Sequence, residues 1–154
     1  MAYLDKELLA KCIDLISILC ETLPAYSSDI LNKSSIMNYI FVLLEVIIII
    51  NFKTNDLFLK QYVLVLIGDL CKTKNKKIEE NFDNLVMLLI ENLENSPSNR
   101  NDPNDVDKIH ICSNSCWAIG LLSAAHSQKL AIYIDQIMDR LLKMLCVPRV
   151  NYTS

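Results

Sequence analysis

SNSCWAIG, the stretch from Ser113 to Gly120, holds the only tryptophan of the chain and predicts a helix with two unlike faces. At about 100° per residue, Trp117 lies opposite the centre of a broad apolar arc. A large indole among small and polar neighbours adds little to a core, so we interpret Trp117 as part of a contact surface. The alternative is a tryptophan buried against a neighbouring helix. The arc itself comprises Ile109, Ile111, Cys112, Ser115, Cys116, Ala118, Ile119 and Leu122.

The composition of the whole chain is typical of a helical protein. Of its 154 residues 52% are hydrophobic, yet only two are glycine, so the chain can bury a core but lacks the residues that tight turns between strands require. We therefore predict an all-α fold. The formal net charge of −3 argues against nucleic acid as a partner and leaves a basic protein partner open.

The cysteines and the apolar segments indicate the environment of the chain. Six cysteines, at positions 12, 20, 71, 112, 116 and 146, fall inside apolar helical patterns, so we expect free thiols in a reducing compartment. Charged residues at 5–7 precede any apolar run long enough for a secretory signal. The apolar segment Ile36 to Ile50 is shorter than the roughly 20 residues of a membrane span and contains Asn38 and Glu45, which favours a buried helix and no membrane partner.

Apolar periodicity predicts a series of helices separated by polar breaks. The longest break, SPSNRNDPND (Ser96 to Asp105), is polar and contains two prolines, so we expect a loop there. We interpret residues 1–154 as one array of helices. The predicted helices span residues 3–23, 35–50, 57–72, 77–93, 106–127 and 129–146.

The spacing of these helices predicts a HEAT-repeat α-α superhelix, a solenoid of antiparallel helix pairs. Trp117 follows Asp69 by 48 residues, and Asp69 follows Glu21 by the same interval, which is near the upper end of the HEAT range once the inserted loops are allowed for. The alternative is a compact helical bundle. Both ends of the chain are apolar helices without a polar capping repeat, which favours a fragment of a longer array.

The helical faces predict a shared outward surface on the first, third and fifth helices. In the first helix we expect an outward stripe of Glu7, Lys11, Asp14, Ser17, Ile18 and Glu21 and a buried arc of Leu8, Leu9, Cys12, Ile13, Leu15, Ile16, Leu19 and Cys20. In the third we expect Phe58, Gln61, Tyr62, Val65 and Asp69 outward and Leu59, Val63, Leu66, Ile67 and Leu70 buried.

Stacked side by side, these stripes would form one acidic and aromatic surface. Such a surface suits an arginine-bearing extended peptide, through charge-assisted hydrogen bonds and cation–π stacking. For each acid taken singly, an ordinary solvated residue is the simpler interpretation. The predicted surface carries Asp14, Glu21, Tyr62, Asp69, Asn114 and Trp117.

Two blocks of the sequence carry a family likeness: QYVLVLIGDLCK (Gln61 to Lys72) and ICSNSCWAIGLLS (Ile111 to Ser123). They resemble the C-terminal HEAT repeats of the transportin family of nuclear import receptors, within the importin-β superfamily. KCIDLISILCETL (Lys11 to Leu23) is similar to the helix two positions earlier in the same array. The likeness therefore covers most of the chain in the right order, although the NxxWAIG element is shared more widely in the superfamily.

This resemblance implies a concave groove that binds cargo proteins through a nuclear localisation signal of basic residues followed by a Pro-Tyr pair. Phe58 stands where the family has an acid and Ser113 where it has a second asparagine, so we expect a different cargo preference. The resemblance also implies shuttling between cytoplasm and nucleus. The small GTPase Ran and nucleoporins would bind parts of a parent chain that this sequence lacks. The positions that match groove residues of the family are Asp14, Glu21, Asp69, Asn114 and Trp117.

Catalytic signatures are weak in this sequence. It contains no glycine-rich phosphate loop, no GxSxG and no HExxH. The closest candidate joins His110 with Cys112 and Cys116, but on a helix these cysteines face the core while His110 faces away. We therefore expect no enzyme, metal or cofactor. Two alternatives to an import receptor stay open: a HEAT scaffold that organises a complex without carrying cargo, and an importin-β relative with another cargo class.

Overall fold

The computed structural model describes residues 5–22, 42, 56–72, 76–93 and 103–145. Every element within these ranges is a helix and none is a strand, which confirms the all-α prediction for this part of the chain. The helix predicted for residues 35–50 lies outside the described residues, except for residue 42. The elements are α1 (Lys6–Thr22), α4 (Leu57–Lys72), α5 (Lys76–Glu80), α6 (Phe82–Leu93), α7 (Pro103–Leu130), the 3₁₀ helix η1 (Ala131–Tyr133) and α8 (Ile134–Leu145).

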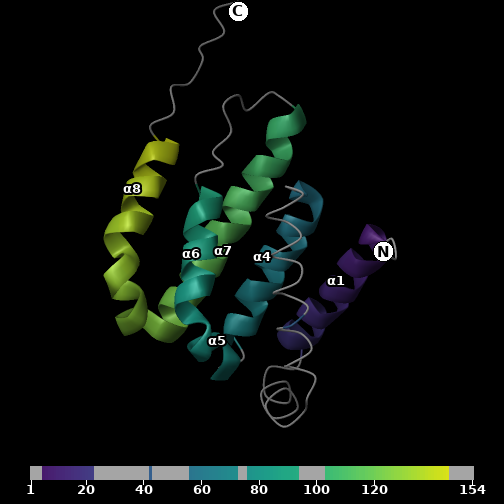
Figure 1. The fold of residues 1–154 in the computed structure, drawn as a ribbon, viewed down its shortest axis with the longest axis horizontal. Helices are drawn as coiled ribbons and strands as arrows, with labels where there is room; N and C mark the ends of the chain where they lie inside the picture. Colours follow the sequence, from purple (N-terminus) through teal and green to yellow (C-terminus); the bar gives the residue numbers. More distant parts are fainter. Residues whose placement is uncertain (1–4, 23–41, 43–55, 73–75, 94–102, 146–154) are drawn as a thin grey trace, which may run out of the picture.

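The helices pack in a fixed order of neighbours. The long helix α7 lies along α4 on one side and along α6 on the other, α4 also packs against α1, and α6 also packs against α8. In Figure 1, α1 and α8 accordingly stand at opposite edges of the molecule, with α4, α7 and α6 between them. Residues from α1, α4 and α7, which are far apart in the sequence, thereby come to lie next to one another.

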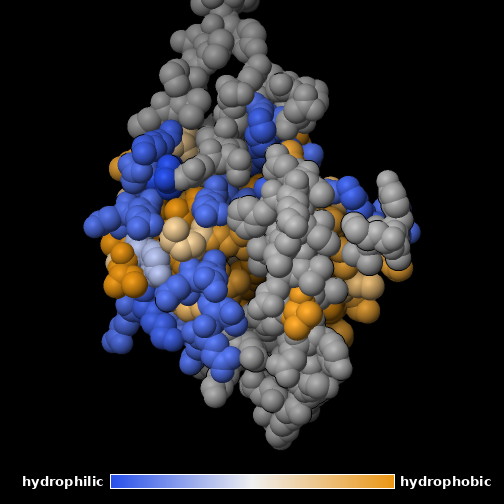
Figure 2. All heavy atoms as spheres, in the orientation of Figure 1, coloured by the Kyte–Doolittle hydropathy of each residue, from blue (hydrophilic) through white to orange (hydrophobic). Residues whose placement is uncertain are grey.

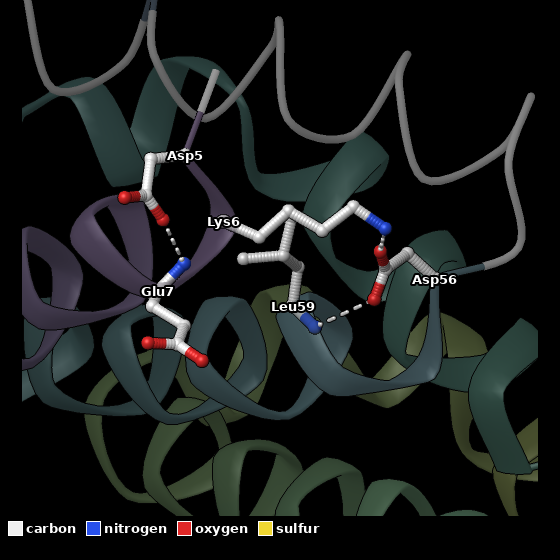
Figure 3. A network of polar contacts seen from close by, with 5 residues as sticks. All are labelled: Asp5, Lys6, Glu7, Asp56 and Leu59. Carbon is white, nitrogen blue, oxygen red and sulfur yellow. Dashed lines mark hydrogen bonds and ion pairs between the residues drawn. The ribbon is translucent and has the colours of Figure 1, made fainter. Parts of the chain in front are cut away.

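Carboxylates fix the beginnings of α1 and α4. Asp5 accepts hydrogen bonds from the backbone N–H groups of Glu7 at 3.0 Å and Leu8 at 3.3 Å, and Asp56 accepts one from Leu59 at 3.3 Å. Each carboxylate satisfies N–H groups that have no partner within the first helical turn. An ion pair from the first residue of α1 to Asp56 ties the two beginnings together, as Figure 3 shows.

The electrostatics of this pair follow from its partners. Burial alone would raise the pKa of Asp56, but the hydrogen bonds from Lys6 and from Leu59 outweigh it and hold this pKa below its ordinary value. The carboxylate therefore stays ionised, and the two helix beginnings stay linked, across the neutral pH range. This link sets how α1 lies against α4, and so where the residues of α1 meet those of the next helix.

The core lies along α4, α6 and α7. On α4 the predicted buried residues are all buried, and they share one core with buried residues of α1, α6 and α7. Polar groups inside bond locally: Ser115 donates to the Ile111 carbonyl at 2.8 Å, and Asn92 to the Leu88 carbonyl at 2.8 Å. The most completely buried large side chains are Ile13, Leu64, Leu66, Ile67, Leu70, Ile78, Leu89, Leu93, Ile111 and Leu122.

Three helix boundaries differ from the prediction. The loop expected up to Asp105 ends earlier, because α7 begins at Pro103, and proline is tolerated at the first position of a helix, where its missing N–H would have had no partner. The helix predicted for 77–93 is divided into α5 and α6 by a turn at Asn81. The break predicted near 128 occurs as non-helical backbone at His126 within α7, followed by η1.

The predicted buried arc of α1 is wrong in part. Leu8, Leu15 and Leu19 were expected inside but are 64%, 58% and 46% exposed, whereas Ser17 was expected outside and is buried. The reason is that apolar residues occupy almost the whole circumference of this helix, so its pattern does not define one face. Packing against α4 on one flank then decides which residues are covered.

Apolar residues also remain exposed on α8, at the other edge of the fold. There Met138, Leu142 and Leu145 are 46%, 54% and 72% exposed, while Ile137 is buried. Figure 2 shows hydrophobic residues gathered at the edge formed by α1, whereas the edge formed by α8 is mostly hydrophilic in this view, with a small hydrophobic patch. In the described part of the chain no helix has both the length and the hydropathy needed to cross a membrane.

Candidate binding groove

A groove of about 230 Å³ lies across α1, α4 and α7. Its volume is below the roughly 300–1,000 Å³ typical of sites for small-molecule ligands. This size suits one side chain of a larger ligand rather than a complete metabolite. The lining residues are Asp14 and Ser17 from α1, Phe58, Gln61, Tyr62 and Val65 from α4, and Asn114 from α7.

The groove combines an acid with an aromatic wall. Phe58 and Tyr62 are one turn apart on α4, with ring centroids 5.2 Å apart and planes at 63°, an edge-to-face pair. Asp14 lies on the opposite wall and makes no side-chain hydrogen bond or ion pair with any other described residue. A carboxylate without an internal partner beside aromatic rings provides both interactions that attract an organic cation.

Hydrogen bonds hold α7 against α4 beside the groove. Asn114 donates from Nδ2 to the backbone carbonyl of Gln61 at 3.3 Å. Gln61 in turn donates from Nε2 to Oδ1 of Asp107 at 3.0 Å. The predicted site residue Asn114 therefore uses its amide within the protein, and its role in the groove is to hold these walls in place.

Trp117 lies on the same side of α7, about one turn beyond Asn114. Trp117 is 40% exposed, so part of the indole faces solvent as predicted, but the edge of the ring nearest α4 packs against that helix. A Cβ placed on Gly68 would lie 2.2 Å from Cζ3 of this indole, far inside van der Waals contact. Gly68 therefore forms a notch for the ring, and Trp117 combines the two interpretations that its sequence context left open.

The position of Asp69 corrects the prediction that it lies on the outward stripe. It is only 4% exposed, and both of its oxygens are paired inside the protein: Ser17 donates a hydrogen bond to Oδ2, and the Lys72 ammonium binds Oδ1 at 2.8 Å. Burial of a carboxylate requires such partners. A helical projection places Asp69 correctly on its helix but cannot show that α1 covers it.

Lys72 joins Asp69 to the tryptophan. Its Nζ lies 5.0 Å from the centroid of the Trp117 ring while it pairs with the Asp69 carboxylate. The resulting cluster, Asp69, Lys72 and Trp117, is a cation held between an acid and an indole. We call it the lysine cluster.

The predicted site residues thus fall into three groups. Asp14, Tyr62 and Asn114 line the groove together, whereas Asp69 and Trp117 belong to the lysine cluster. The sixth residue, Glu21, is exposed near the end of α1 and lines neither.

Sequence reasoning missed Lys72 and Gly68 as parts of this surface. Both left a signal. Lys72 follows Asp69 by three residues, a spacing at which opposite charges meet on a helix. Gly68 is one of two glycines in the chain, and a glycine inside a helix costs about 1 kcal/mol relative to alanine, so it usually has a packing reason.

Burial disfavours the thiolate form at two of the cysteines, Cys20 and Cys71. The five cysteines in the described residues are free. Burial, with the Asp69 charge as a second cause, raises the pKa of Cys20 to about 11 and that of Cys71 to about 12, so both thiols stay protonated near neutral pH. Within the described ranges, no three His, Cys, Asp or Glu side chains are grouped so as to hold a metal ion.

Comparisons of this chain with protein-family models, with curated proteins and with solved structures gave no match.

Proposed function

We propose that this chain binds extended basic peptides in the groove across α1, α4 and α7, as part of a HEAT-repeat import receptor of the transportin kind. The ligand would be the nuclear localisation signal of a cargo protein, with basic residues ahead of a Pro-Tyr pair. The ligand class is inferred from the resemblance of the sequence blocks to the transportin family. The binding position is inferred from the groove and its lining residues.

The packing order of the helices supports the repeat architecture in this proposal. α1, α4 and α7 are successive neighbours, α6 packs against α7, and α6 and α8 are neighbours in turn. Two parallel rows of helices, with one row facing a binding surface, are the arrangement of a solenoid. The exposed apolar stripes of α1 and α8 have the character of faces through which further repeats stack.

The observation that carries the proposed activity is the Asp14 carboxylate beside the Phe58 and Tyr62 rings. An arginine side chain inserted there would donate to the carboxylate and stack on a ring, the two interactions for which a guanidinium is best suited. The groove is open and holds one side chain, so neighbouring residues of the peptide would run over its rim toward Trp117.

A titration tests this proposal. An arginine-rich peptide ending in Pro-Tyr is added to the chain, and Kd is measured by fluorescence anisotropy of the labelled peptide. Asp14→Asn should weaken binding about tenfold, because one charge-assisted hydrogen bond is lost. Asp139→Asn is the matched control, since it removes an equal charge from the exposed surface of α8. Equal affinities of the two variants would refute the groove as the binding site.

A further inference from the structure

Lys72 fills a site that joins an acid to an aromatic ring, the combination that attracts an organic cation. Its ammonium is bound to a buried carboxylate at 2.8 Å and lies 5.0 Å from the centroid of the Trp117 ring. Its side chain is 31% exposed, so the cluster opens to solvent and can be reached by a ligand. The chain therefore presents two acid-and-aromatic sites: one open, at Asp14, and one filled by its own lysine.

We propose that Lys72 is an internal placeholder, which an incoming arginine or lysine of a bound peptide must displace from Asp69 and Trp117. This inference rests on the proposed function of the groove and concerns how that function is regulated. The second oxygen of Asp69 accepts from Ser17, so the carboxylate keeps its orientation when the lysine leaves. Lys72 is in the last turn of α4, where its side chain can swing into solvent.

The need to displace Lys72 weakens the apparent affinity of the chain for the peptide. When a site is competent only in a fraction of the molecules, the apparent Kd is the intrinsic Kd divided by that fraction. One cation–π contact and one partly exposed ion pair would keep the lysine in place in most molecules, so we expect its removal to tighten binding about five- to tenfold. The factor should be equal for arginine and lysine peptides, because both displace the same side chain.

A second explanation of tighter binding must be separated from this one: Lys72 could act only by repelling a basic ligand. Lys72→Arg keeps the charge but binds a carboxylate and an indole more firmly, through a planar fork of donors. The placeholder model therefore predicts weaker peptide binding by Lys72→Arg than by the unmodified chain, by severalfold. Pure repulsion predicts no difference between them.

The experiment compares Kd for the same Pro-Tyr peptide, in an arginine-rich and a lysine-rich version, among the unmodified chain, Lys72→Met, Lys72→Gln, Lys72→Arg and Lys143→Met. Lys72→Gln retains a donor for Asp69 in case Lys72→Met fails to fold. Lys143→Met removes an equal charge from α8 and is expected to leave Kd nearly unchanged. Binding by every variant with one common Kd would overturn the placeholder but leave the proposed function standing. Absence of binding by every variant would refute the proposed function and the placeholder together.

Discussion

Gly68→Ala tests the contact between α4 and the tryptophan. The added methyl would lie 2.2 Å from Cζ3 and 2.7 Å from Cε3 of Trp117, whereas ordinary contact begins at 3.4 Å. The ring would therefore have to retreat by about 1.2 Å, toward the solvent that already covers 40% of it.

The magnitude follows from two opposed effects. Replacing a helical glycine by alanine gains about 1 kcal/mol from helix propensity, while overpacking a close contact costs about 1–3 kcal/mol. Gly120→Ala separates them, because a methyl at Gly120 meets nothing within 4 Å. We expect Gly120→Ala to stabilise the chain by about 1 kcal/mol and Gly68→Ala to be about 1–3 kcal/mol less stable than that control.

Urea unfolding gives the two free energies, and the emission of Trp117, the only tryptophan, reports its surroundings directly. Gly68→Ala should shift this emission to the red and raise quenching by iodide, while Gly120→Ala should leave both unchanged. If Gly68→Ala stabilised the chain as much as Gly120→Ala and left the emission unaltered, the indole would not rest in the notch.

Further predictions concern the core, the beginning of a helix and the dependence of the free energy of unfolding on alkaline pH. Leu66→Ala should cost about 2–5 kcal/mol in urea unfolding, because Leu66 is fully buried. Asp5→Ala should cost about 1 kcal/mol by the same assay, with loss of the cap of α1, whereas the exposed Glu7→Ala should not. Since the pKa of Cys71 is raised from 9.0 to about 12 in the folded chain, the unfolded chain releases this proton first. Stability should fall by up to about 1.4 kcal/mol per pH unit as the pH rises from 9 toward 12, and Cys71→Ala should remove that part of the slope.

The sequence predicts α4 well and α1 poorly, for one physical reason. In α4, Leu59, Val63 and Leu66 repeat on one side of the helix, so the pattern identifies residues that are buried, although Asp69 on the other side is buried as well. In α1, apolar residues surround the helix, and Leu8 and Leu15 are exposed only because of where α4 packs. Periodicity gives the helix but not its orientation when both sides are apolar.

The candidate site shows the same limit. Asp14 and Tyr62 could be placed on one surface from helical spacing, because each extends from its own helix into the space between helices. The burial of Asp69 could not be predicted from helical spacing, since it depends on Ser17 of another helix and on how the Lys72 side chain folds back. Charge pairing along a helix is visible in a sequence, whereas the cover supplied by a neighbouring helix is set by tertiary packing.

Peptide binding in the groove across α1, α4 and α7 can be located by an amide chemical-shift map of the ¹⁵N-labelled chain during titration with the arginine-rich Pro-Tyr peptide. If the peptide binds in the groove, we expect saturable shifts concentrated at Asp14, Tyr62 and Asn114, with smaller ones at Trp117 and none along α8. Shifts confined to α8, or shifts spread without saturation over the acidic surface, would contradict binding in the groove across α1, α4 and α7.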